Sequence, residues 1–148
     1  MSSRRSLQIC NLLAITLALG SAASASELRV IATGLDNQGQ AELRLYASRI
    51  GFPRQPSYVL SATVENGTAQ WVLPDLGPSD YAAYVFHDRD GDGQPDGGFS
   101  PEPWAYSNGR PFEKLDWDEA IFSLGVDPVL VEINLADEEE DDEEDDED

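Results

Sequence analysis

Cysteine is nearly absent from this 148-residue chain: the only one is Cys10, close to the N-terminus. It lies inside a segment with the features of a secretory signal, so we expect no cysteine in the mature protein. That absence excludes a disulfide scaffold, a cysteine-ligated zinc site and a cysteine nucleophile. Histidine is as scarce, since His87 stands alone, and one histidine without cysteine does not build a conventional zinc site.

Basic residues are also few. The chain has 9 Lys and Arg against 29 Asp and Glu, which gives a formal net charge of −20 at pH 7. Such a surface repels the phosphates of nucleic acids and the headgroups of anionic membranes. No apolar run beyond residue 25 is long enough to span a bilayer. We therefore expect no nucleic-acid partner and no membrane partner. We also expect a monomer.

Three segments of the chain differ in composition. Residues 1–25 combine paired arginines, an apolar run and small residues at the end, which is the pattern of a signal peptide. The pattern leaves open whether export uses the general or the twin-arginine route. Residues 137–148 are all Asp or Glu, a run that we expect to be disordered. The folded unit is then a β-sandwich domain over residues 26–136 of a secreted or periplasmic protein.

The central part of the chain alternates as β-strands do. Within residues 41–46, Leu43 and Leu45 fall on one face and polar residues on the other. Asn66-Gly67 is a strong hairpin signal because both residues tolerate positive φ. The pattern predicts an all-β fold, an antiparallel immunoglobulin-like or transthyretin-like Greek-key sandwich of about seven strands. Strands are expected over residues 28–32, 41–46, 58–64, 68–73, 81–87 and 129–135, with the fifth at the centre.

One short helix fits residues 117–124, where Asp116 could cap its start and Gly125 could end it. A short strand or an irregular turn fits residues 120–124 equally well. Residues 88–115 are rich in Gly, Pro and acids and have no convincing strand. A loop of that length inside a compact domain is usually functional or disordered, and its aromatic residues argue against disorder.

The most informative motif is the DRDGDGQPD sequence of residues 88–96. Carboxylates recur at loop positions 1, 3, 5 and 9, with glycine at position 6, as in the first part of a calcium-binding EF-hand loop. Calcium takes several oxygen ligands at about 2.3–2.6 Å, which alternate residues of a curling loop can supply. Calcium is favoured over magnesium because the ligands are many, flexible and all oxygen. The expected ligands are Asp88, Asp90, Asp92, the carbonyl oxygen of Gln94, and Asp96.

The loop also departs from an EF-hand. Position 12 is Phe99 rather than a bidentate glutamate, Pro95 lacks an N–H group, and a strand precedes the loop. We therefore expect the chemistry of the loop without the EF-hand fold. Glu102 could fold back as a further ligand. The alternative is a solvated acidic turn that binds no cation tightly.

Several other residues admit more than one role. His87 adjoins the loop and could act as a general base or support the cation, but a structural role at a strand end fits it better. Trp71, Trp104, Tyr106 and Trp117 could form a platform for a sugar or a peptide. The alternative is packing, with Trp71 in the core and Trp104 over the end of the sandwich. Pairs of Asp and Glu could catalyse hydrolysis, although no pair is marked out.

Several short motifs follow one another along the chain: GFP at 51–53, VFHD at 85–88, DGDGQPD at 90–96, PE at 101–102, YSN at 106–108 and DEAIF at 118–122. Their order resembles the bacterial family called domain of unknown function 2141. The resemblance extends over residues 27–135, and the acidic tail falls outside it. It implies a small exported β-sandwich protein and leaves the activity open.

These observations predict a secreted or periplasmic β-sandwich, stabilised by calcium, that acts as a binding or structural module. The first alternative is a carbohydrate- or peptide-binding module that uses the aromatic residues of the 99–117 segment. The second is a hydrolase with a carboxylate acid/base pair. We assign no catalytic residue.

Overall fold

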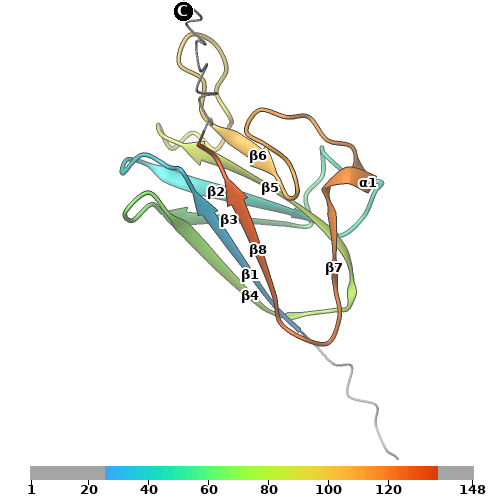
Figure 1. Ribbon diagram of the computed structural model, residues 1–148. Coiled ribbons are helices and arrows are strands. Elements are labelled where there is room, and N and C mark those ends of the chain that lie inside the picture. The colour runs from blue at the N-terminus through green and yellow to red at the C-terminus, as the bar shows by residue number, and fades with distance from the viewer. Residues whose placement is uncertain (1–25, 137–148) are drawn as a thin grey trace, which may run out of the picture.

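The computed structural model describes residues 26–136, which form a sandwich of two β-sheets and one helical turn (Figure 1). The expected all-β sandwich is confirmed, with eight strands. The expected signal peptide and acidic tail, residues 1–25 and 137–148, lie outside the described residues. The elements are β1 (Ser26–Thr33), β2 (Gln40–Tyr46), β3 (Tyr58–Thr63), β4 (Ala69–Leu76), β5 (Ser79–Asp88), β6 (Trp104–Tyr106), α1 (Trp117–Ala120), β7 (Ile121–Leu124) and β8 (Val129–Asn134).

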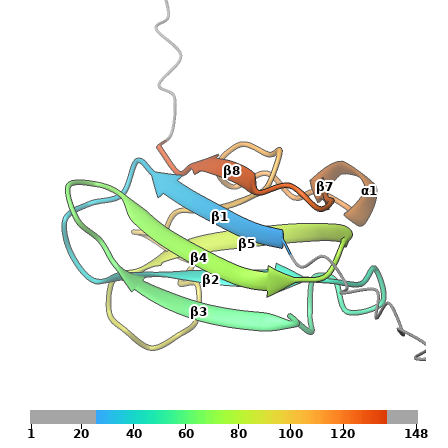
Figure 2. The same cartoon turned by 90° about the horizontal axis from the view of Figure 1, so that it is seen from below.

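The smaller sheet has the strand order β4-β1-β8 (Figure 2). β1 and β4 are antiparallel, with Val30 opposite Trp71. β1 and β8 are parallel, with Val30 opposite Val131, so one pair departs from the expected antiparallel arrangement. The parallel pair arises because β7 belongs to the other sheet. The chain therefore crosses between the sheets after β7 and enters β8 at the end where β1 begins.

The larger sheet has the order β3-β2-β5-β6, and β7 also pairs with β5. β5 is the central strand, as expected. β7 pairs with residues 79–82 of β5 and β6 with residues 84–86, so the two short strands share one edge. Ser107 occupies the gap between them: its N–H donates to Ala83 O at 2.9 Å, and its Oγ accepts the Ala83 N–H at 2.9 Å. The same Oγ donates to Ala120 O at 2.6 Å.

The core lies between the two sheets and follows from the alternation of the strands. Leu43 and Leu45 of β2 are fully buried and face Val30 of β1 across one apolar cluster. Burial of each such side chain is worth about 1.5–3 kcal/mol. Trp71 takes the core position that we expected: it is 5% exposed, and its Nε1 donates to Leu60 O at 3.1 Å.

A second apolar cluster covers the outer face of the larger sheet. Tyr46 and Tyr84 belong to it, and Phe52 from the loop after β2 and Trp117 of α1 pack against it. The rings of Phe52 and Trp117 lie 5.9 Å apart, centroid to centroid. β5 is consequently buried on both faces from its third residue onward. Trp104 packs in this cluster and not over the end of the sandwich, where we expected it.

Two local expectations require correction. The sequence predicts no strand within residues 88–115, but β6 lies there, because three residues pair with the edge of β5. The expected helix over residues 117–124 ends at Ala120. Asp116 caps it as expected, since its side chain accepts two backbone N–H groups of the first turn. From Ile121 onward the backbone pairs with β5, so the strand alternative holds for the second half.

Helix α1 has four residues. Within residues 26–136, no helix is long and apolar enough to cross a membrane.

Candidate functional site

The acidic loop, residues 88–102, begins where the central strand β5 ends. Asp88 is its first carboxylate and is 7% exposed. Its Oδ1 accepts the N–H of Gly91 at 2.8 Å and its Oδ2 accepts the N–H of Gly93 at 3.2 Å. Both glycines have positive φ, 79° and 73°, a conformation that glycine adopts without strain. The two glycines therefore let the loop curl around the Asp88 carboxylate.

The next two carboxylates each hold the backbone two residues ahead. Asp90 Oδ1 accepts the N–H of Asp92 at 3.1 Å. Asp92 Oδ1 accepts the N–H of Gln94 at 2.7 Å. Both are Asx turns, the local hydrogen bond that aspartate makes readily in a loop. The carboxylates that recur at every second position of the sequence therefore form consecutive Asx turns.

Glu102 closes the loop from its far end. It is 3% exposed, and its carboxylate accepts the N–H of Arg89 at 2.6 Å and that of Asp96 at 3.1 Å. The backbone N–H of Glu102 donates in return to Asp96 O at 3.0 Å. Glu102 therefore returns to the start of the loop, as the sequence suggested.

Three carboxylates converge: oxygen atoms of Asp88, Asp90 and Glu102 lie within 4.8 Å of one another. We call this group the acidic triad. The other two expected carboxylate ligands, Asp92 and Asp96, are exposed residues of the same loop and stand outside the triad. The expected ligand set of Asp88, Asp90, Asp92, Gln94 and Asp96 stays a prediction.

In the described part of the chain, no basic side chain forms an ion pair with the triad. Arg89, the only basic residue of the loop, points elsewhere: its Nη2 donates to Asp36 Oδ2 at 2.6 Å. The negative charge of Asp90 is the main cause of a raised pKa at Asp96, with smaller contributions from burial and from Asp92. The loop therefore concentrates negative charge.

His87 faces away from this charge. Asp88 follows it on β5, and successive side chains of a strand point to opposite faces. His87 is fully buried, and its Nε2 donates to Gln38 O, 2.6 Å away, because a carbonyl oxygen can only accept. Its Nδ1 has no hydrogen-bond partner in the described part of the chain. His87 thus ties the loop between β1 and β2 to β5, which is a structural role.

Arg44 connects the acidic loop to the outer face of the larger sheet. Its Nε donates to Glu42 Oε1 at 2.7 Å, and its Nη2 donates to the carbonyl oxygen of Gly93 at 2.8 Å. The guanidinium also lies over the Phe86 ring, 5.0 Å from its centroid. The orientation of Arg44 is consequently fixed from three sides.

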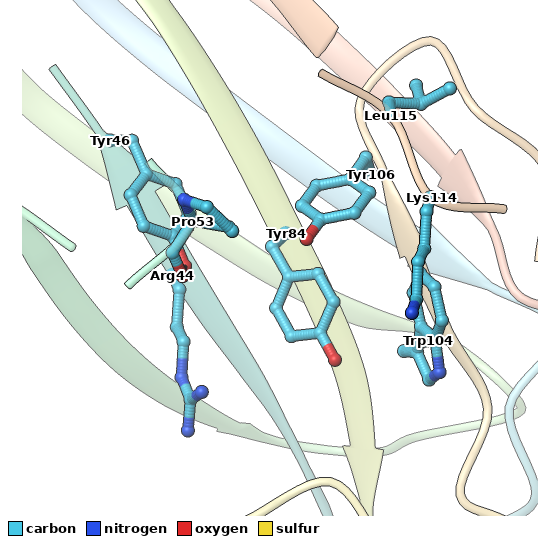
Figure 3. A pocket seen from close by; sticks show the side chains of 8 residues that line it. All are labelled: Arg44, Tyr46, Pro53, Tyr84, Trp104, Tyr106, Lys114 and Leu115. Atoms are coloured by element: carbon cyan, nitrogen blue, oxygen red, sulfur yellow. Dashed lines mark hydrogen bonds between the residues drawn. The ribbon is translucent and has the colours of Figure 1, made fainter. Parts of the chain in front are cut away.

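A pocket of about 380 Å³ opens on this outer face (Figure 3). Figure 3 shows Arg44, Tyr46 and Pro53 on one side, Tyr84 in the middle, and Lys114 on the other side. Trp104, Tyr106 and Leu115 complete the lining. The pocket brings together residues of β2, β5, β6 and two loops, so no single segment of the sequence could reveal it.

At neutral pH the tyrosine hydroxyls of the pocket are protonated. Burial, the largest effect, raises the pKa of Tyr46 to about 12 and raises that of Tyr84 further. Burial also raises the pKa of Tyr106. The Tyr46 hydroxyl donates to Pro53 O at 2.9 Å. The Tyr84 and Tyr106 hydroxyls remain neutral groups that can donate to a ligand.

Comparisons with known proteins identify the family to which the chain belongs and nothing further. No curated protein and no solved structure matches it. A family profile described as "Uncharacterized protein conserved in bacteria (DUF2141)" matches residues 30–131, a range that includes the acidic loop and the pocket. The match confirms the resemblance seen in the motifs, and the chain belongs to the DUF2141 family.

Proposed function

We propose that this protein is an exported β-sandwich module whose loop of residues 88–102 binds a calcium ion. One observation carries the proposal: the acidic triad holds three carboxylates within 4.8 Å, and no ion pair of residues 26–136 neutralises them. Like charges at that separation repel one another. A divalent cation among them replaces the repulsion with attraction.

The hydrogen bonds of the triad are compatible with a bound metal. Each carboxylate oxygen offers two lone-pair directions. The two oxygens of Asp88 and the two of Glu102 accept one backbone N–H each. One direction on each oxygen stays open to a cation. The same bonds hold the carboxylates in position, so binding requires less ordering of side chains.

The chemistry of the donors favours calcium. Every ligand that we propose is oxygen, and a curling loop provides many of them, as calcium requires. Magnesium prefers near-ideal octahedral geometry and retains its waters. Glu102, which lies beyond the twelfth position of the loop, adds one further carboxylate. The full set is the acidic triad with Asp92, the carbonyl oxygen of Gln94, and Asp96.

The affinity should be modest. In the usual loop a bidentate glutamate ends the twelve-residue sequence, whereas Phe99 stands at that position here. We expect a Kd of about 10⁻⁴–10⁻³ M, the range of extracellular calcium modules. This range agrees with export, which we propose from the signal-like residues 1–25. N-terminal sequencing of exported protein should find Ser26, or a residue within two or three of it, at the start.

The experiment is thermal unfolding of the full chain, first freed of metal and then with calcium at ten times its Kd. Linkage predicts about 1.4 kcal/mol of stabilisation, which is a rise of roughly 4–8 °C for a domain of this size. Glu102→Gln should lose most of that rise. The control is Glu132→Gln, because Glu132 is an exposed carboxylate on β8, outside the acidic triad. An equal calcium response in the two variants would contradict the proposal.

A second candidate function is carbohydrate or peptide binding through the aromatic residues of the 99–117 segment. One observation favours it, since Trp104 and Tyr106 line the pocket. For the third candidate, hydrolysis by a carboxylate pair, this pocket offers no support, because no carboxylate lines it.

A further inference from the structure

The charges around the pocket on the outer face of the larger sheet are unlike those of the rest of the chain. Two of its eight lining residues, Arg44 and Lys114, are basic and none is acidic. The chain as a whole has 9 basic and 29 acidic residues. We propose that this pocket binds a pyranose ring that carries a carboxylate, such as a hexuronic acid unit of an acidic polysaccharide.

The aromatic lining suits a sugar ring. Trp104 is partly exposed, and its ring centroid lies 5.7 Å from that of Tyr84 and 5.8 Å from that of Tyr106. The C–H face of a pyranose packs well on such rings, which combine an apolar face with a polar edge. The hydroxyls of Tyr84 and Tyr106, which have no hydrogen-bond partner within residues 26–136, can donate to ring oxygens.

The two cations suit the carboxylate. Lys114 forms no ion pair within residues 26–136, so its ammonium group is available to an anion. Arg44 uses its Nε and one Nη2 hydrogen in the bonds to Glu42 and Gly93, which leaves Nη1 free to donate. Because those bonds already hold the guanidinium, an anion gains a preorganised donor.

The net charge of −20 does not forbid an anionic ligand. At physiological salt the Debye length is about 8 Å, so distant exposed charges are screened and the cations that touch the ligand dominate. Glu42 offsets part of the Arg44 charge, which makes Lys114 the main source of preference for an anion.

The pocket and the acidic triad share no residue, so the two proposals can fail separately. Arg44 and Gly93 are joined by a hydrogen bond, and Gly93 belongs to the acidic loop. Each titration is therefore performed with chelator and again with calcium. Sugar binding by a chain whose melting temperature does not respond to calcium would leave this inference standing while the calcium proposal failed.

The test is calorimetric titration of the full chain at about 0.15 M salt with three probes: tri-galacturonic acid, neutral galactotriose, and benzoate. We expect tri-galacturonic acid to bind more tightly than galactotriose, and benzoate to bind least. Lys114→Gln should weaken binding of tri-galacturonic acid about fivefold and weaken that of galactotriose much less. The matched control is Arg110→Gln, an exposed cation of the same loop outside the pocket, which should change neither.

Four outcomes would overturn the inference. The first is no binding of tri-galacturonic acid. The second is equal binding of the acidic and neutral trisaccharides, which would make the pocket a neutral-sugar site. The third is benzoate binding as tight as that of tri-galacturonic acid, since the sugar ring would then contribute nothing. The fourth is an equal loss in Lys114→Gln and Arg110→Gln, which would indicate general electrostatic attraction.

Discussion

The carboxylate of Glu102 accepts the backbone N–H of Arg89 at 2.6 Å, and this contact joins the two ends of the acidic loop. Arg89 follows directly after β5, whereas Glu102 lies just before β6. The pairing of β5 with β6 brings these points together in space. The position of the third triad carboxylate therefore depends on the sheet as well as on the loop.

The first prediction tests whether the calcium site is centred on the acidic triad or is defined only by the regular spacing of carboxylates along the loop. Asp90 belongs to the triad, whereas Asp92 stands outside it and accepts the N–H of Gln94. Asp90→Asn should therefore reduce the calcium-induced rise in melting temperature more than Asp92→Asn does. Thermal unfolding of both variants, with chelator and with calcium, measures the difference. A larger loss in Asp92→Asn would mean that the triad is not the centre of the site.

The second prediction concerns Ser107, which joins β5 to both of its short neighbours. Its hydroxyl accepts the N–H of Ala83 and donates to Ala120 O. Ser107→Ala leaves these buried groups without partners, so the free energy of unfolding should fall by about 2 kcal/mol. Urea denaturation gives this value. Ser123→Ala serves as the control, because Ser123 is exposed and should change stability by about 0.5 kcal/mol or less.

The third prediction is a loss of stability at high pH. Burial raises the pKa of Tyr46 from its ordinary value of 10.0 to about 12 in the folded protein. The stability that this shift contributes is fully present below pH 10 and is lost as the pH rises toward 12. Denaturant unfolding between pH 8 and 12 should therefore give a falling free energy, and Tyr46→Phe should make the fall shallower. An identical fall in the variant would show that Tyr46 does not contribute.

The sequence predicted those parts of the fold that depend on local pattern. The strict alternation around Leu43 predicted β2, and Asn66-Gly67 predicted a tight turn, at which both residues have the expected positive φ. The hairpin expected there is limited to the Glu65–Thr68 bridge, because β3 and β4 then enter different sheets. β6 could not be predicted, because its three residues form a strand only through pairing with β5. The helix expected over residues 117–124 ended early for the same reason: strand pairing of Ile121 outweighs local preference.

The two candidate sites also differ in how much of each could be predicted from the sequence. The acidic loop could be found from its spacing, because its first carboxylates lie within nine residues. Glu102 could be suggested but not assigned, since its position depends on the sheet. The sequence indicated two aromatic residues of the pocket, Trp104 and Tyr106, as a platform. Arg44, Tyr84 and Lys114 could not be added to them, because they come from distant parts of the chain and meet only in the folded protein.

The central claim is that the acidic loop binds calcium, and calorimetric titration of calcium into the metal-free full chain tests it most directly. We predict saturable binding with a Kd of about 10⁻⁴–10⁻³ M, weakened at least about tenfold by Glu102→Gln and unchanged by Glu132→Gln. Identical titration curves for the wild type and Glu102→Gln would contradict the account, because any calcium bound would then lie elsewhere in this acidic chain.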